Sequence, residues 1–275
     1  MMIRVFVTLA IGLIFSISSQ AQVLLCDFFK VQVFEQTSNN TMPSTPLVYV
    51  ADGAVEPTSA GDYSGVTINT IHPYSFDGFE WYFQNQYASK ALLDADFPPA
   101  SSVVVALAAG TQPSASENIP IGADDYPTSP PYLTGTSYDD LQGLDTTQSI
   151  QIDFVTPGSA GADGGSFEII EDPNGAETPI SEIALAQLTN SVSIPADFLN
   201  PSTEYRCIIT FSRITSLPAD PAGLNAPKDV AYEMVTIVDF TTSGCPLTAD
   251  LNGDGVVNGA DLGLLLGKWG TDGVF

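Results

Sequence analysis

Hydrophobic and polar residues alternate with a period of two along most of this 275-residue chain. Such alternation is typical of β-strands with one buried face, and β-branched and aromatic residues are frequent in the alternating runs. Turn residues separate the runs about every ten positions. The pattern therefore predicts an all-β protein. The clearest runs are Val31–Phe34, Leu47–Val50, Val66–Ile68, Phe79–Phe83 and Val103–Val105.

Residues 111–135 interrupt this pattern. They are rich in Pro, Ser, Gly, Asp and Thr and show little apolar periodicity. Such a composition is typical of a linker or a long loop between domains. We therefore expect two β-sandwich-like domains, one at 22–110 and one at 136–243, each large enough to form its own core.

A motif in the second expected domain precedes one of its strands. Leu199, Pro201 and Tyr205 follow a Leu-x-Pro-x-x-x-Tyr spacing. This spacing resembles the tyrosine corner of fibronectin type III and immunoglobulin-like sandwiches, which implies a hydrogen bond between the Tyr205 hydroxyl and upstream backbone. The alternative is another Greek-key sandwich with a chance match. The resemblance also implies that Tyr205, Cys207, Ile209 and Phe211 face inward, and we expect Val235–Phe240 to be the last strand.

Oxygen-bearing side chains recur at fixed spacing in the twelve residues from Asp250 to Asp261. They stand at positions 1, 3, 5, 9 and 12, and Gly255 stands at position 6, where the chain must turn sharply. This is the ligand pattern of an EF-hand calcium loop. The alternative is a surface turn rich in Asp, Asn and Gly. The predicted Ca²⁺ ligands are Asp250, Asn252, Asp254, the Val256 carbonyl, Asn258 and Asp261.

An apolar helix face is predicted directly after this loop. Leu262, Leu265, Leu266 and Trp269 follow an i, i+3, i+4, i+7 spacing and therefore share one face. Together with the loop, residues 245–275 resemble a single dockerin type I repeat, which implies a secreted bacterial protein that docks through this face. A complete dockerin has two such repeats, and we find no second loop upstream. The implied partner is a cohesin-like or other surface receptor protein.

The first 21 residues have the pattern of a secretory signal peptide. Arg4 precedes an apolar run from Val5 to Phe15, and small residues lead to Ala21, after which we expect cleavage. The alternative, an uncleaved membrane anchor, requires a longer apolar run. No other segment has the composition to span a bilayer, so we expect an extracellular or cell-surface protein without a transmembrane segment after cleavage.

Charge and cysteine content refine this picture. The chain has 7 Lys and Arg residues against 32 Asp and Glu residues, for a net charge of −25. Such a surface repels nucleic acid, which we exclude as a partner. An exported chain with three cysteines can form one disulfide, and these are Cys26, Cys207 and Cys245. The sequence does not show which two would pair, or whether all three are unpaired.

Candidates for catalysis are few. The single histidine, His72, has no accompanying nucleophile motif, and we interpret it as a loop or strand-end residue. Two carboxylates at the right separation can hydrolyse glycosides. Aromatic side chains can stack on sugars, and the surface candidates are Tyr74, Tyr82 and Tyr87. The alternation of Phe79, Trp81 and Phe83 instead favours a strand whose aromatic side chains face the core. The acidic candidates by position are Glu80, Glu168, Glu171 and Asp172.

These observations favour a secreted, non-catalytic protein whose C-terminal segment binds calcium and docks or anchors the chain. The alternative is a component that binds or degrades polysaccharide, of the glycoside hydrolase type, because proteins with dockerins often have that activity. Polysaccharide is therefore a second partner class to consider.

Overall fold

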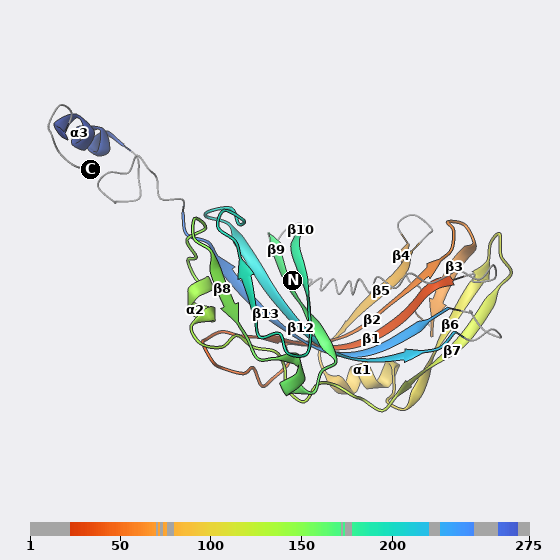
Figure 1. Cartoon of the computed structure of the whole chain (residues 1–275). Coiled ribbons are helices and arrows are strands. Elements are labelled where there is room, and N and C mark those ends of the chain that lie inside the picture. Colours follow the sequence, from red (N-terminus) through yellow and green to blue (C-terminus); the bar gives the residue numbers. More distant parts are fainter. Residues whose placement is uncertain are drawn as a thin grey trace.

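The structure is a computed structural model, and it describes residues 23–69, 71, 74–75, 80–171, 173, 178–219, 226–244 and 258–268. Within these ranges the protein is mostly β-sheet, as the alternating pattern predicts, and its strands form a large sheet and two small ones (Figure 1). The expected signal peptide at 1–21 lies outside the described residues. No helix in the described ranges has the length and hydrophobicity needed to cross a membrane.

The large sheet has eight strands in the order β10-β9-β12-β13-β1-β2-β5-β4. Neighbouring strands are antiparallel except β1 and β13, which run parallel. The strands are β1 (Val23–Glu35), β2 (Val48–Pro57), β4 (Tyr74–Ser75), β5 (Trp81–Tyr87), β9 (Gly164–Glu171), β10 (Thr178–Leu185), β12 (Glu204–Leu217) and β13 (Lys228–Thr241).

The small sheets and short helices complete the fold. One sheet has the order β3-β6-β7 and the other pairs β11 with β8. Their strands are β3 (Tyr63–Ile68), β6 (Ser101–Ala109), β7 (Ala115–Gly122), β8 (Ile150–Asp153) and β11 (Ser191–Ile194). The helices are α1 (Lys90–Asp96), α2 (Ser137–Leu141), the 3-10 turn η1 (Pro157–Ala160) and α3 (Gly259–Lys268).

Both small sheets pack on the same face of the large sheet, which we call the covered face. Even-numbered residues of β13 define it, because successive side chains of a strand point to opposite faces. Val230 and Tyr232 share a core with β3, β6 and β7. Val238 and Phe240, further along the same strand, share a second core with β8 and β11. The result is a sandwich-like arrangement at each end of one continuous sheet.

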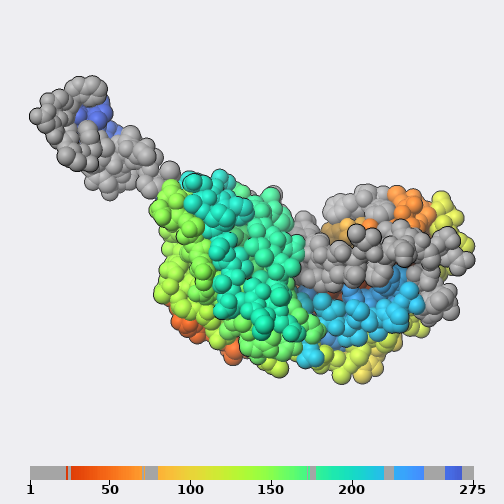
Figure 2. Space-filling model, viewed as in Figure 1, coloured from red at the N-terminus to blue at the C-terminus, as the bar shows by residue number. Residues whose placement is uncertain are grey.

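The long strands join the two halves of the molecule. Strands β12 and β13 each have 14 residues, and β1 has 13, so each continues past a single small sheet. In the space-filling view the two halves are adjoining masses, one coloured green to cyan and the other yellow and blue (Figure 2). The expected units at 22–110 and 136–243 therefore share one sheet.

The segment at 111–135 differs from the linker that we expected. It contains β7, which pairs with β6 over seven residue pairs. Ile119 and Ile121 point into the core, while Pro120 between them is exposed. Only two alternating apolar residues mark the strand, and the surrounding Pro and Ser residues obscure so short a signal.

The predicted tyrosine corner is present. The backbone N–H of Asn200 donates a hydrogen bond to the Tyr205 hydroxyl at 2.8 Å. Tyr205 and the alternate residues that follow it, Cys207, Ile209 and Phe211, are all buried in the core beneath β8 and β11. The prediction that these four side chains face inward is confirmed. The expected last strand at 235–240 is likewise confirmed within β13.

The register of the sheet excludes one of the disulfides that the sequence leaves open. Cys26 pairs in register with Lys228, and Cys207 pairs with Val238, ten positions further along β13. Ten strand residues span about 33 Å, whereas the Cα atoms of a disulfide lie within about 7 Å of each other. Both thiols are free and buried. Cys245 lies outside the described residues.

A buried ion network fixes α1 to the covered face. The Lys30 ammonium, on β1, is fully buried and contacts Asp94 Oδ1 at 2.7 Å and Asp124 Oδ1 at 2.8 Å. Lys90 contacts the second oxygen of each carboxylate. Two cations thus balance two anions, which is the condition for burying charge without a large desolvation penalty.

Candidate functional site

The start of α3 coincides with the end of the predicted calcium loop. Asn258 precedes the helix, and its side-chain oxygen accepts a hydrogen bond from the Ala260 N–H at 2.7 Å. The Asp261 carboxylate accepts a hydrogen bond from the Asn258 N–H at 2.8 Å. These reciprocal bonds form a capping box, which satisfies backbone donors that a helix start otherwise leaves open. An acidic residue in the first turn also suits the helix dipole.

The capping box brings together positions 9 and 12 of the predicted loop. Asp261 is only 2% exposed, so its carboxylate is held in a defined place. Both side chains offer oxygen atoms, which are the ligands that Ca²⁺ prefers, and they fit the site on that ground. In the described ranges no cluster of three or more His, Cys, Asp or Glu is arranged for a metal. The other predicted ligands, Asp250, Asn252, Asp254 and Val256, lie outside those ranges.

The leucines of α3 are mostly exposed. Leu262 and Leu266, from the predicted docking face, are 54% and 61% exposed, and Leu265 between them is half-buried. Leu264 is also exposed, although the i, i+3, i+4 spacing does not include it. The apolar surface is therefore wider than the predicted face. Trp269 lies outside the described residues.

The described acidic candidates for glycoside hydrolysis are not brought together. Glu80 directly precedes β5, whereas Glu168 lies on β9. Four strands separate β5 from β9 in the sheet, which at about 4.8 Å per step places them about 24 Å apart. Glycosidase carboxylates lie within about 10 Å of each other. Glu171 points to the opposite face from Glu168, and Asp172 and His72 lie outside the described residues.

The aromatic candidates divide between core and surface. Phe83 is buried and stacks with Phe28 and Phe97, as the alternating pattern predicts. Tyr82 and Tyr87 are half-buried, and the Tyr87 hydroxyl donates a hydrogen bond to Asp96. Phe79 and the side chain of Tyr74 fall outside the described parts. The two described tyrosines are neither fully exposed nor on one face, so they form no flat platform for a sugar.

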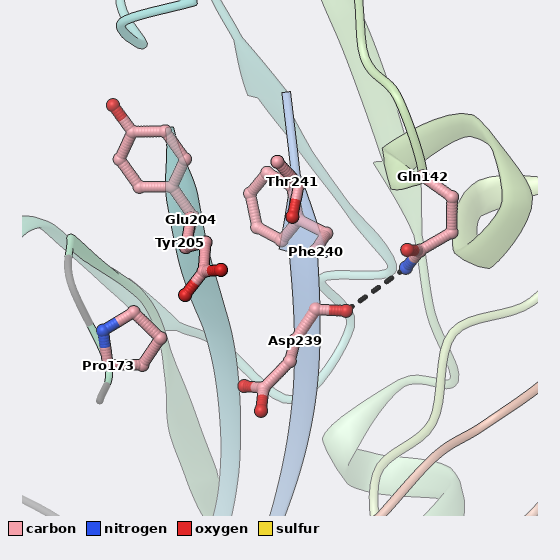
Figure 3. Close-up of a pocket in the computed structure, with 7 residues that line it drawn as sticks. All are labelled: Gln142, Pro173, Glu204, Tyr205, Asp239, Phe240 and Thr241. Carbon is pink, nitrogen blue, oxygen red and sulfur yellow. Dashed lines mark hydrogen bonds between the residues drawn. The ribbon is translucent and has the colours of Figure 1, made fainter. Parts of the chain in front are cut away.

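A small pocket lies where β12 begins and β13 ends (Figure 3). Its volume of about 210 Å³ is below the roughly 300–1,000 Å³ of typical ligand sites. The Asp239 carboxylate beside it is held by two bonds from Arg206, at 2.6 and 2.9 Å. We assign this pocket no ligand. It is lined by Gln142, Pro173, Glu204, Tyr205, Asp239, Phe240 and Thr241.

Comparison with known proteins gives no family for this chain. No protein-family model and no curated protein matches it. Among solved structures, the chicken CNTN1 FN1-FN3 domains are 9% identical, with a TM-score of 0.25, over 78% of this chain and 63% of that one. The BSP domain of a biofilm associated protein is 11% identical, with a TM-score of 0.22, over 72% and 27%.

The human OSCAR ligand-binding domain is 8% identical, with a TM-score of 0.20, over 77% of this chain and 96% of that one. The chain spans less than two thirds of the first two structures.

The second face of the large sheet contains a group of carboxylates that the sequence pattern did not predict. Glu233 is fully buried in the middle of β13, within an apolar run from Ala231 to Ile237. The sequence signal for this group is an acidic residue inside an apolar run, because a buried strand rarely contains an acidic residue without a partner. The sequence of β13 shows no alternation of hydrophobic and polar residues, because both faces of the strand are buried.

Proposed function

We propose that the chain is an exported, non-catalytic protein of the cell surface or extracellular space, and that its C-terminal segment binds Ca²⁺ and docks onto a protein receptor. The receptor would be a cohesin-like or other surface protein. The supporting observation is the capping box, which fixes Asp261 at the first turn of α3. The exposed leucines that follow it provide an apolar surface for docking.

The residues of the chain couple the loop to the helix. Ca²⁺, when bound, would supply positive charge that offsets the carboxylates of Asp250, Asp254 and Asp261. Asp261 accepts a hydrogen bond from the Asn258 N–H and also lies in the first turn of the helix, so any order in the loop extends to α3. Leu262 follows Asp261 directly, which ties the docking surface to the same residues. Binding energy at the loop thereby becomes folding energy of the segment.

Calorimetry on the chelator-treated protein tests the metal site. We expect heat of Ca²⁺ binding in the native chain and none in Asp250→Asn, which removes the charge at position 1. Asp197→Asn provides a matched control, because Asp197 is an exposed loop residue far along the chain from the tail. If the native chain gives no heat, or if both variants bind alike, the calcium site is wrong.

Retention on the cell surface tests the docking role separately. Leu266→Ser removes a 61% exposed leucine from α3, whereas Leu188→Ser removes an 88% exposed leucine elsewhere. We expect only Leu266→Ser to release protein into the medium when Ca²⁺ is present. Equal retention of both variants would contradict docking through α3, even if calcium binding is intact.

A further inference from the structure

Two carboxylates stand side by side at the start of the parallel pairing that joins the two halves of the large sheet. Asp27 of β1 is in register with Asp229 of β13, next to the first pair of this ladder, Cys26 with Lys228. Residues in register on neighbouring strands are about 4.8 Å apart and project to the same face. Here that face is the second face of the sheet, which the odd-numbered residues of β1 and β13 form. The pairing therefore places two acids together at the junction between the halves.

A hydrogen bond holds the Asp27 side chain against its neighbour. The backbone N–H of Asp229 donates to Asp27 Oδ1 at 3.2 Å, so the Asp27 carboxylate lies against the backbone of β13. Both side chains are half-buried. Like charges on neighbouring strands repel, and partial burial weakens the screening that water provides. One proton shared between the two carboxyl groups removes this repulsion.

No described cation faces the pair. Lys30 and Lys228 occupy even-numbered positions and point to the covered face, as does Arg213, which is in register with an even-numbered residue of β13. Arg206 shares the face of the pair but is bound to Asp239, toward the other end of β13. The described groups that face the pair from its own and neighbouring strands are neutral or acidic: Asp52, Ala54 and Glu56 on β2, Glu80 and Tyr82 at the start of β5, Ser216 on β12 and Glu233 on β13.

The protonation of Asp27 is consistent with this geometry. Burial, and after it the charge of Asp229, raises the pKa of Asp27 from 3.8 to about 7, although the hydrogen bond from the Asp229 N–H lowers it. When the strand starts separate, water reaches the carboxyl group and its pKa returns to the ordinary value. Closing the strand starts therefore takes up one proton between about pH 4 and about pH 7. The closed form loses stability as the pH rises through this range, and the loss is complete above it.

We propose that Asp27 and Asp229 form a pH-sensitive clasp on the parallel junction. In acid the two carboxyl groups share one proton, and the starts of β1 and β13 stay together. As the pH rises toward neutral, that proton leaves, two adjacent negative charges remain, and the strand starts separate more often. The clasp involves neither the calcium loop nor α3, so its test does not depend on the proposed function.

Hydrogen exchange followed by NMR tests the clasp on the exported chain, residues 22–275. Exchange of the backbone amides at 26–29 and 228–231, corrected for the intrinsic pH dependence of exchange, gives the equilibrium constant for opening the strand starts. Uptake of one proton on closing makes this constant rise about tenfold for each pH unit, so we expect a rise of about a hundredfold from about pH 5 to about pH 7. An opening constant that does not change with pH would overturn the proposal.

Three variants assign the proton to the pair. Asp27→Asn keeps the shape of the side chain without its titration and should reduce the rise to less than about tenfold. Asp229→Asn should reduce the rise in part, because Asp27 then lacks its like-charged neighbour but remains half-buried. The matched control is Glu35→Gln, since Glu35 lies on the same strand and face but is exposed and in register with Ile237. A full rise in either Asn variant, or an equal reduction in the control, refutes the clasp.

A titration of the native chain checks the same proton without a variant. The carboxyl carbon of Asp27, followed by its NMR chemical shift, should titrate with a midpoint near the raised pKa of about 7. A midpoint near the ordinary value of about 4 would show that the closed pair holds no proton at neutral pH and would rule out the clasp.

Discussion

Replacing Lys30 with Met tests whether the buried ion network fixes α1 to the large sheet. Met has nearly the length of Lys but no charge, so the change removes the ammonium and keeps most of the apolar contact. Asp94 and Asp124 are then left with Lys90 as their single cation. The backbone carbonyl of Phe97 also loses its bond from Lys30, at 3.3 Å. The network changes from neutral to one net negative charge.

The size of the effect follows from burial. Removing one partner of a fully buried ion pair typically destabilises a protein by about 3–5 kcal/mol. Asp94 and Asp124 are 24% and 17% exposed, so solvent stabilises part of the charge that is left behind. We therefore expect Lys30→Met to lower the free energy of unfolding by about 2–3 kcal/mol. Lys90→Met provides the control, because Lys90 is 39% exposed and its pairs should contribute below about 1 kcal/mol.

Urea unfolding followed by circular dichroism measures both variants. Burial alone would raise the pKa of Asp94, but the hydrogen bonds from Lys30 and Lys90 outweigh it and hold the pKa below its ordinary value. A carboxylate with a lowered pKa stabilises the fold above its unfolded pKa, and this stability is lost on acidification. The loss in acid should therefore be smaller in Lys30→Met. If Lys30→Met lowers the free energy of unfolding no more than Lys90→Met does, the buried ion network does not fix α1 to the sheet.

Three further predictions concern single residues. Tyr205→Phe removes the acceptor for the Asn200 N–H and should cost about 1–2 kcal/mol in urea unfolding; an unchanged midpoint would mean that the corner contributes nothing. The pKa of Glu233 is raised from 4.5 to about 7, so its ionisation destabilises the fold as pH rises. Glu233→Gln should stabilise by up to about 3 kcal/mol at about pH 8 and not at about pH 4, whereas a pH-independent effect would contradict this. Burial raises the pKa of Cys26 to about 12 and also raises that of Cys207, so alkylation followed by peptide mapping should find both labelled only after unfolding. Labelling of Cys26 or Cys207 in the native chain, or a disulfide between them, would refute the register.

The parts of the fold that the sequence predicts are those in which local pattern and burial agree. The corner at Tyr205 is local, because its hydrogen bond joins residues five positions apart. Strand β7 is the opposite case, since its two buried isoleucines are too few to show a period. The shared sheet could not be predicted from local patterns either. It depends on the parallel pairing of β1 with β13, whose partners are about two hundred positions apart.

The distribution of the few basic residues connects the fold with the proposed function. Lys30, Lys90, Arg206, Arg213 and Lys228 each form an ion pair with an acid of the same chain. Arg4 and the side chain of Lys268 lie outside the described parts of the chain. The chain has 32 acidic residues, so most of them have no cation available within the protein. This excess of negative charge supports the proposed binding of a divalent ion by the C-terminal segment, and it would repel an anionic ligand.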